Sequence, residues 1–146
     1  LYENPVNTFI GHFIGSPGMN LLECGVTENG AAPHAQIGPH TISVSADIHD
    51  EIDLSWTDCQ IGIRPSSVTV QVADPKEDTD YIPATVDQVE MVGGYQILTT
   101  RLDDTEVEVK ARVAHDFMIE EGASIWLNFP PDTVQFFHEK QAVHAQ

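Results

Sequence analysis

Residues 84–100, ATVDQVEMVGGYQILTT, decide how this chain folds. Two segments rich in Val, Ile and Thr flank the pair Gly93-Gly94. β-Branched side chains favour extended backbone, and glycine readily adopts the positive φ angles that a two-residue hairpin turn requires. The stretch therefore predicts two strands, 84–92 and 95–100, joined by a tight hairpin.

The same pattern continues through most of the chain. Ten glycines and nine prolines are spread among further stretches rich in Val, Ile and Thr, which favours many short strands joined by turns. Turn signals lie at 27–30, 74–77 and 102–104. The expected strands are residues 20–26, 41–46, 60–64, 68–73, 84–92, 95–100, 107–113, 124–129 and 134–137. The predicted fold class is mainly β.

The N-terminal segment has a different pattern. Asn4-Pro5 is a typical helix start, with a capping side chain followed by proline at the first helical position. Apolar residues then recur with helical spacing, at Val6, Phe9, Ile10, Phe13 and Ile14. Gly15-Ser16-Pro17-Gly18 would end such a helix. We therefore expect a short amphipathic helix over residues 5–14.

Two other segments are less regular. The acidic segment 47–58 has Ile48, Ile52 and Trp56 at a spacing that is compatible with a helical turn or with a loop over the core. The polar end of the chain after Phe137 is expected to fray.

With 146 residues, of which 41% are hydrophobic, the chain can bury one core or two small lobes that share a boundary. A single compact domain is the default expectation.

The charge balance is the most unusual bulk property. Twenty-three acidic side chains against six basic ones give a formal net charge of −17, and the basic residues are scattered singly. This argues against nucleic acid or an anionic membrane surface as a partner, because both attract clusters of Lys and Arg. The acidity is compatible with a solvated surface, with adaptation to high salt, or with a basic partner.

No apolar run approaches the roughly 20 residues needed to span a bilayer, and the start lacks the pattern of a secretory signal. We expect no direct membrane insertion. Because the chain opens Leu1-Tyr2-Glu3 without a methionine, we expect it to be a fragment of a longer protein.

The sequence contains few signs of a catalytic or ligand-binding site. The chain has no phosphate-binding GxxxxGK[ST] loop, no GxSxG elbow, no HExxH and no GxGxxG motif. The seven histidines never recur at spacings that aim two rings at one metal, and His34 and His40 are the single pair that merits a test. Cys24 and Cys59 form no CxxC motif, so we expect two free thiols, with one disulfide as the alternative. We predict no catalytic, cofactor-binding or metal-binding residues.

Several stretches resemble one protein family. The first is YENPVNTF at 2–9 followed by FIGSPGMN at 13–20. This pair resembles the junction at which the nucleotide-binding domain passes into the C-terminal regulatory (TOBE/OB-type) domain in importer ATPases of the maltose and glycerol-3-phosphate type. Further matches in the same order are GIRP at 62–65, GASIWLNF at 122–129 and VQFF at 134–137. Departures at Gly18, Ser66-Ser67 and His138 leave the subgroup unassigned.

The resemblance implies an OB-type barrel with a second small β lobe, preceded by the short helix. It divides the chain into residues 1–15, a helix linking to an ATPase domain that this sequence does not contain, and residues 16–146, the regulatory β domain. It implies a non-catalytic regulatory and dimerisation role in an ABC importer for sugars or glycerol phosphates. ATP and Mg²⁺ would bind only the parent's ATPase domain, so no cofactor is expected here.

The resemblance also implies partners and a location. The partners would be the parent's ATPase domain, a second copy of the subunit, the transporter's membrane subunits and a regulatory protein, with the domain in the cytoplasm at the inner face of the membrane. The candidate hinge and interface residues are Gly15, Ser16, Pro17, Met19, Asn20, Arg64 and Trp56. Arg64 is expected to hold a carboxylate or backbone carbonyls, and Trp56 to pack, or to anchor an interface if exposed.

Two alternative functions stay open at this stage. Related domains in oxyanion importers resemble oxyanion-binding barrels, so a small-molecule or oxyanion sensor is one alternative, although the acidic charge opposes it. Barrels of this kind also bind nucleic acid, but that use requires a basic groove with stacking aromatic residues.

Overall fold

A computed structural model describes residues 18–30, 32–76, 80–139 and 141–143 of the chain. Within them are eleven strands, arranged in two antiparallel sheets, and three short 3-10 helices. The predicted helix 5–14 and the turn residues 15–17 lie outside the described residues. The chain divides into two compact units, residues 1–63 with 131–146 and residues 64–130.

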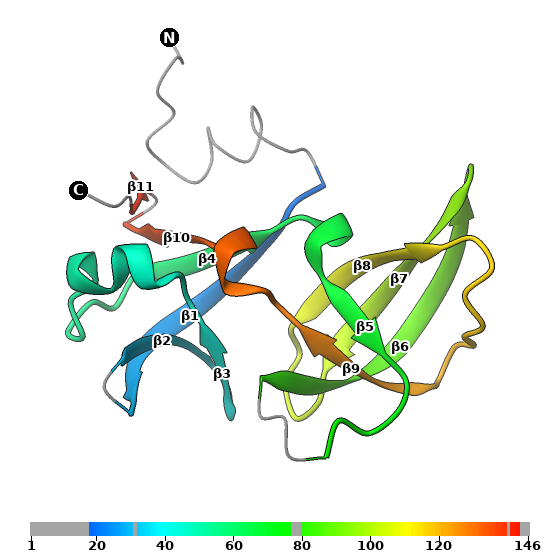
Figure 1. The fold of residues 1–146 in the computed structure, drawn as a ribbon, viewed down its shortest axis with the longest axis horizontal. Coiled ribbons are helices and arrows are strands. Elements are labelled where there is room, and N and C mark those ends of the chain that lie inside the picture. The colour runs from blue at the N-terminus through cyan, green and yellow to red at the C-terminus, as the bar shows by residue number, and fades with distance from the viewer. Residues whose placement is uncertain (1–17, 31, 77–79, 140, 144–146) are drawn as a thin grey trace, which may run out of the picture. The chain divides into compact units, whose positions relative to one another are not determined.

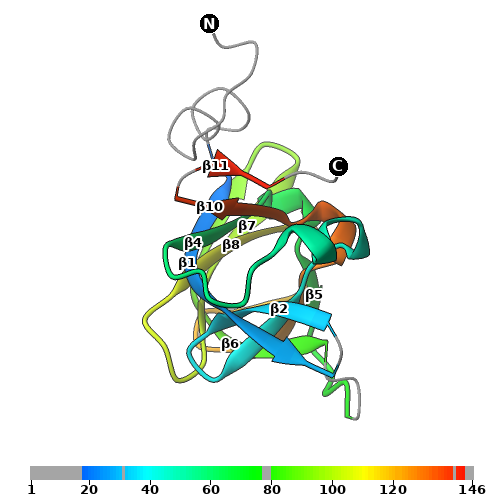
Figure 2. The same cartoon turned by 90° about the vertical axis from the view of Figure 1, so that its left-hand side faces the viewer.

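The first unit is built on a six-stranded sheet with the order β11-β10-β4-β1-β2-β3 (Figure 1). Its strands are β1 (Asn20–Asn29), β2 (Ala32–Ile37), β3 (His40–Ser43), β4 (Cys59–Ile63), β10 (Gln135–His138) and β11 (Gln141–Ala142). Strand β1 serves two neighbours: residues 20–24 pair with β4, and residues 25–29 pair with β2 (Figure 2). The core of this unit consists mainly of Leu22, Ala35, Ile37, Ile42, Ile61, Ile63 and Phe136.

The second unit is a five-stranded sheet with the order β5-β9-β6-β7-β8. Its strands are β5 (Thr69–Gln71), β6 (Tyr81–Val92), β7 (Tyr95–Leu102), β8 (Glu108–Ala114) and β9 (Ser124–Asn128). Buried and half-buried residues alternate along the whole of β7, as expected for a strand with one face on a core. The core of this unit consists mainly of Ile82, Val86, Leu98, Leu102, Val109, Ile125 and Leu127.

The predicted hairpin is confirmed. Val92 pairs with Tyr95 across the two-residue turn, and Gly93 has a φ of 61°, in the region that favours glycine. The register shifts between Val86 and Gln88, which marks an irregularity in β6. This irregularity lies beside the loop that leads into β9, because the Val86 N–H donates to the Ala123 carbonyl at 2.9 Å.

Three details of the sequence-based prediction were wrong. Residues 32–37 form β2 where a loop was expected; Pro33 lies near the start of that strand and outside its pairing with β3. The strand predicted over 41–46 ends at Ser43, because the Ser45 hydroxyl accepts from the Asp47 N–H and caps the 3-10 helix η1 (Ala46–Glu51). Residues 141–142, expected to fray, pair with β10.

The two remaining 3-10 helices are η2 (Pro65–Ser67) and η3 (Pro131–Thr133). Each begins with a proline, which suits the first position of a helical turn because proline has no N–H to leave unsatisfied there. They follow closely on the two points at which the chain passes from one unit to the other, Ile63–Arg64 and Pro130–Pro131.

Candidate functional site

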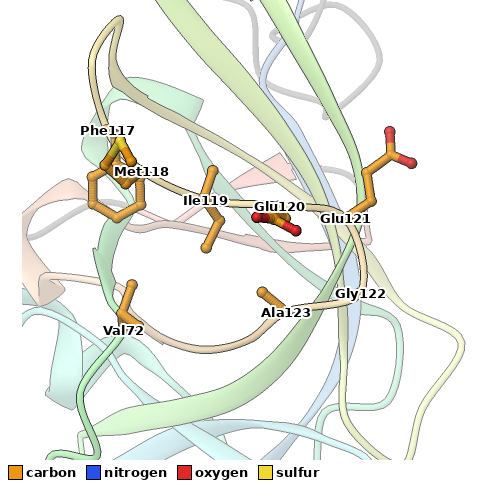
Figure 3. Close-up of a pocket in the computed structure, with 8 residues that line it drawn as sticks. All are labelled: Val72, Phe117, Met118, Ile119, Glu120, Glu121, Gly122 and Ala123. Carbon is orange, nitrogen blue, oxygen red and sulfur yellow. The ribbon is translucent and has the colours of Figure 1, made fainter.

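The loop between β8 and β9, residues 115–123, carries the most exposed apolar surface of the second unit. Phe117, Met118 and Ile119 follow one another in this loop, and together with Val72, just after β5, they line an open pocket. The other lining residues are Glu120, Glu121, Gly122 and Ala123, and the pocket volume is about 710 Å³. Figure 3 shows Val72, Ile119 and Ala123 directed toward the same space, with Glu121 pointing away from it.

Hydrogen bonds from β6 and β7 hold this loop in place. The buried Gln96 side chain on β7 donates through Nε2 to the carbonyls of Ala114 at 2.9 Å, His115 at 3.3 Å and Phe117 at 2.9 Å. At the other end, the Gly122 N–H donates to the Val86 carbonyl at 2.7 Å. Both ends of the loop are therefore fixed to the sheet, and the apolar side chains project from a defined frame.

The exposure of this surface is high for apolar side chains. Met118 is 89% exposed and Val72 is 52% exposed, while Phe117 and Ile119 are half-buried. None of the described lining residues is basic, and two are glutamates. Glu121 accepts from the Val89 N–H at 3.4 Å, which places its carboxylate at the margin of the pocket beside β6. An exposed apolar surface of this kind suits contact with another molecule.

Met19 and Asn20, two of the sequence-predicted interface residues, lie at the start of β1 against the end of β4. Asn20 is buried, pairs with Ile63, and donates through Nδ2 to the Ile63 carbonyl at 3.1 Å. A Cβ added at Gly62 would lie 2.8 Å from the Met19 sulfur and 3.3 Å from Cε1 of Phe137. Close packing of these two side chains therefore favours glycine at this position of the GIRP stretch.

Arg64 and Trp56 occupy different surroundings. Arg64 is exposed, immediately precedes η2, and accepts from the Ser67 N–H through its carbonyl at 2.9 Å. Trp56 is half-buried in the loop after η1, where its ring stacks on His138 with centroids 3.9 Å apart and an interplanar angle of 8°. Packing thus accounts for Trp56, while a role in an interface stays a prediction for both residues.

The turn that carries Trp56 is fixed by Asp53. Its carboxylate accepts from the Ser55 N–H at 2.9 Å and from the Ser55 hydroxyl at 2.7 Å. These two hydrogen bonds hold the pKa of Asp53 below its ordinary value, with a smaller contribution from the nearby His138. The Trp56 N–H donates to the Asp53 carbonyl at 3.0 Å, which closes the turn.

His34 and His40 lie at opposite ends of the β2–β3 hairpin. His34 is opposite Ser43, and His40 is opposite Ile37, so they are three residue pairs apart, or roughly 10 Å along the strands. Nδ1 of His34 is 3.1 Å from the Ala32 carbonyl. Among the described residues, no group of three His, Cys, Asp or Glu side chains could hold a metal ion.

Cys24 and Cys59 are free thiols that face each other directly across β1 and β4. Burial raises the pKa of Cys24 to about 12, with a smaller contribution from Cys59 beside it. Burial likewise raises the pKa of Cys59 to about 11, with the Asp58 carboxylate adding to the effect. Both thiols are therefore protonated and weakly nucleophilic at neutral pH.

A second pocket of the second unit has one cationic side chain, that of Arg112, in its lining. It has a volume of about 490 Å³ and is lined by Ser66, Gly94, Tyr95, Arg112, Val113 and Ala114. The Arg112 guanidinium carbon lies 3.9 Å from the centre of the Tyr95 ring, a cation–π contact.

Within the part of the chain that the structure describes, no helix is long and apolar enough to cross a membrane.

Sequence reasoning did not single out the loop 115–123. The available signal was the run Phe117-Met118-Ile119 outside any predicted strand, followed by Glu-Glu-Gly. Consecutive apolar residues in a surface loop are unusual unless they serve a purpose. The two anchors, Gln96 and Val86, could not be assigned from the sequence because they lie about twenty to forty positions away from the atoms that they hold.

The chain resembles known proteins in sequence. Residues 61–137 match the family described as TOBE domain. The chain is 30% identical over 130 residues to the sn-glycerol-3-phosphate import ATP-binding protein UgpC of Salmonella typhimurium, covering 89% of this chain and 34% of that protein. For the protein of the same name from Paraburkholderia xenovorans, the identity is 32% over 143 residues, with 94% and 36% covered. The chain spans about a third of the length of these curated relatives.

A solved structure supports the fold. The cytoplasmic molybdate-binding protein ModG, crystallised with molybdate bound, superposes with a TM-score of 0.62 over 86% of this chain and 98% of ModG. The sequence identity is 11%, so the likeness concerns the fold alone. It confirms the predicted mainly β, OB-type architecture, which here comprises two antiparallel sheets.

Proposed function

The chain belongs to the TOBE domain family, and from that premise we propose that it is the non-catalytic regulatory and dimerisation domain of an ABC importer's ATP-binding subunit. The observation that carries the proposal is the match of nearly the whole chain to about a third of proteins named for glycerol-3-phosphate import and ATP binding. The transported substrate would be a sugar or a glycerol phosphate.

The sequence agrees with a division of labour within such a subunit. It has no phosphate-binding GxxxxGK[ST] loop. ATP and Mg²⁺ would bind elsewhere in the parent protein. The domain would work in the cytoplasm, at the inner face of the membrane, through its contacts with the ATPase domain, the membrane subunits and a second copy.

The proposed regulation is a difference in contact free energy between two states of the subunit pair. A domain that gains more contact with its partners in one state than in the other shifts the equilibrium toward that state. Surfaces, and not an enclosed active site, are therefore the functional parts of the molecule. Met19, Asn20, Arg64 and Trp56 remain the proposed hinge and interface residues, together with Gly15, Ser16 and Pro17 outside the described part.

A titration with Mg-ATP tests the non-catalytic part of the proposal. Isothermal titration of this chain should give no saturable heat, because its sequence contains no phosphate-binding GxxxxGK[ST] loop. Saturable binding at micromolar concentration would contradict the proposal. The positive control is the complete ATP-binding subunit under the same conditions.

An oxyanion-sensing domain is the alternative function, and the pocket at Arg112 is the observation that favours it. An anion there would meet one guanidinium, whose face is already on the Tyr95 ring, in a chain with a net charge of −17. The regulatory proposal predicts no thermal stabilisation by molybdate, sulfate or phosphate. A saturable rise in melting temperature that Arg112→Gln abolishes would favour the sensor instead.

A further inference from the structure

We propose that the pocket formed by Val72, Phe117, Met118 and Ile119, here called the Met118 pocket, docks a protein segment that presents an apolar side chain beside Lys or Arg. The inference rests on the proposed regulatory function and names the chemistry of the partner. The proposed occupant of the pocket is a partner protein with a basic, apolar segment, and not a second copy of this chain.

The Met118 pocket exposes several apolar side chains to water. Three consecutive apolar residues stand in the loop 115–123, and Met118 leaves 89% of its surface in water. Val72 adds a second exposed side chain from a distant part of the sequence, so the patch is assembled by the fold. Apolar area is stabilised by removal from water, and methionine adapts its shape to different partners. The pocket of about 710 Å³ can accept a side chain of the size of leucine.

The charge of the surroundings selects the occupant. Glu120 lines the pocket, the Glu121 carboxylate lies at its margin beside β6, and Asp116 precedes the apolar run. None of the described lining residues is basic. A second copy would bring two rims of glutamates and two net charges of −17 together. Lys or Arg beside the docked side chain would instead meet opposite charge, which favours encounter and sets orientation. An anionic membrane is disfavoured by the same rim.

The frame of the pocket reduces the ordering that binding requires. Gln96 holds the carbonyls of Ala114, His115 and Phe117, and the Gly122 N–H is bonded to the Val86 carbonyl. The loop backbone is therefore set before a partner arrives, and the main freedom to be lost is that of the Met118 side chain. Preorganisation of this kind increases affinity by lowering the entropic cost of binding.

Nuclear magnetic resonance of the ¹⁵N-labelled chain tests the proposal. The probe is a short synthetic peptide with one leucine between two pairs of lysines, and the matched peptides replace the leucine by serine or the lysines by glutamates. We expect the leucine–lysine peptide to shift the amide signals of residues 117–123 and Val72. The serine peptide should bind about tenfold more weakly, as expected from loss of one buried aliphatic side chain. The glutamate peptide should cause no shift.

Two protein variants complete the test. Met118→Ser should weaken the leucine–lysine peptide about tenfold, whereas Met91→Ser removes another exposed methionine, on β6, and should leave the affinity unchanged. Glu120→Gln should reduce both the affinity and its dependence on salt. Equal effects of Met118→Ser and Met91→Ser, or peptide-induced shifts spread over the whole acidic surface, would overturn the proposal.

Concentration-dependent shifts at 117–123 without any peptide would assign the pocket to a second copy and would equally overturn it. These outcomes are distinct from failure of the proposed function. Saturable binding of Mg-ATP would contradict the non-catalytic role whatever the peptide does, and an unoccupied Met118 pocket would leave the family membership and the regulatory role standing.

Discussion

Replacing Gln96 by leucine should destabilise the loop 115–123 and the sheet beneath it. Gln96 is 6% exposed, and its Nε2 donates to three carbonyls of the segment from Ala114 to Phe117. Leucine has a similar volume but no donor, so these carbonyls lose their side-chain partner. A hydrogen bond contributes about 0.5–1.5 kcal/mol net, so loss of the two shorter bonds, to Ala114 and Phe117, gives an expected destabilisation of about 2 kcal/mol.

Hydrogen exchange measures this effect where it occurs. The Phe117 N–H donates to the Ala114 carbonyl at 3.1 Å, so its exchange reports opening of the loop. A loss of about 2 kcal/mol corresponds to an approximately 30-fold faster exchange, because each 1.4 kcal/mol is a factor of ten. The melting temperature should fall by roughly 8–16 °C for a unit of this size.

Gln71→Leu is the matched control. Gln71 is half-buried, and its Nε2 donates to the Ala73 carbonyl at 2.8 Å in a hydrogen bond that is exposed to solvent. Loss of this bond should change stability by less than about 0.5 kcal/mol. If Gln96→Leu and Gln71→Leu have equal effects, the anchoring role assigned to Gln96 is refuted. Unchanged exchange at Phe117 with a lowered melting temperature would show that Gln96 supports the core and not the loop.

Four further predictions concern the first unit and the whole chain. Gly62→Ala should destabilise the chain by about 1–3 kcal/mol in urea unfolding, since the new methyl group would overlap Met19 and press on Phe137; an unchanged midpoint would contradict the packing argument. Because burial raises the pKa of Cys24 to about 12 and of Cys59 to about 11, alkylation of the folded chain should be slow at pH 8, and two labels should appear on denaturation without reductant. Above pH 9 the thiols of the unfolded chain lose their protons, whereas the buried thiols of the folded chain keep theirs. The free energy of unfolding should therefore fall as the pH rises from about 9 toward 11–12. A free energy of unfolding that does not change over this range would argue against the burial of the thiols. The isolated chain should self-associate weakly and more strongly as salt rises, because its net charge of −17 opposes approach; sedimentation showing a tight dimer at every salt concentration would assign the contact to apolar surface.

The sheet of the second unit was largely predictable because its signals are local. Gly93-Gly94 specifies a turn, and the flanking alternation specifies strands, so the β6–β7 hairpin was predicted with its turn in place. The strand β2 was missed because Pro33 and the pair Gly38-Pro39 leave only a short apolar alternation, at Ala35 and Ile37, between two turn signals. Its place is determined by pairing with β1 and β3, which no local pattern reports.

The candidate site was predictable only in part. Asn20, which was chosen from the family junction, lies where the start of β1 pairs with the end of β4, and its choice follows from a motif. The Met118 pocket depends on contacts between segments far apart in the chain: Val72 with the loop before β9, and Gln96 with the carbonyls after β8. Such a surface is created by the register of strand pairing and by side-chain hydrogen bonds across the sheet. Both depend on the folded chain, so no local sequence pattern predicts them.

The most direct measurement of the central claim compares the ATP-binding subunit that would carry this domain with the same subunit lacking the residues that correspond to 20–146. Sedimentation velocity with and without Mg-ATP, together with ATP hydrolysis, reports dimerisation and catalysis separately. Our account predicts that the shortened subunit still binds and hydrolyses ATP but loses self-association in the absence of nucleotide. Loss of ATP binding with self-association intact would contradict it.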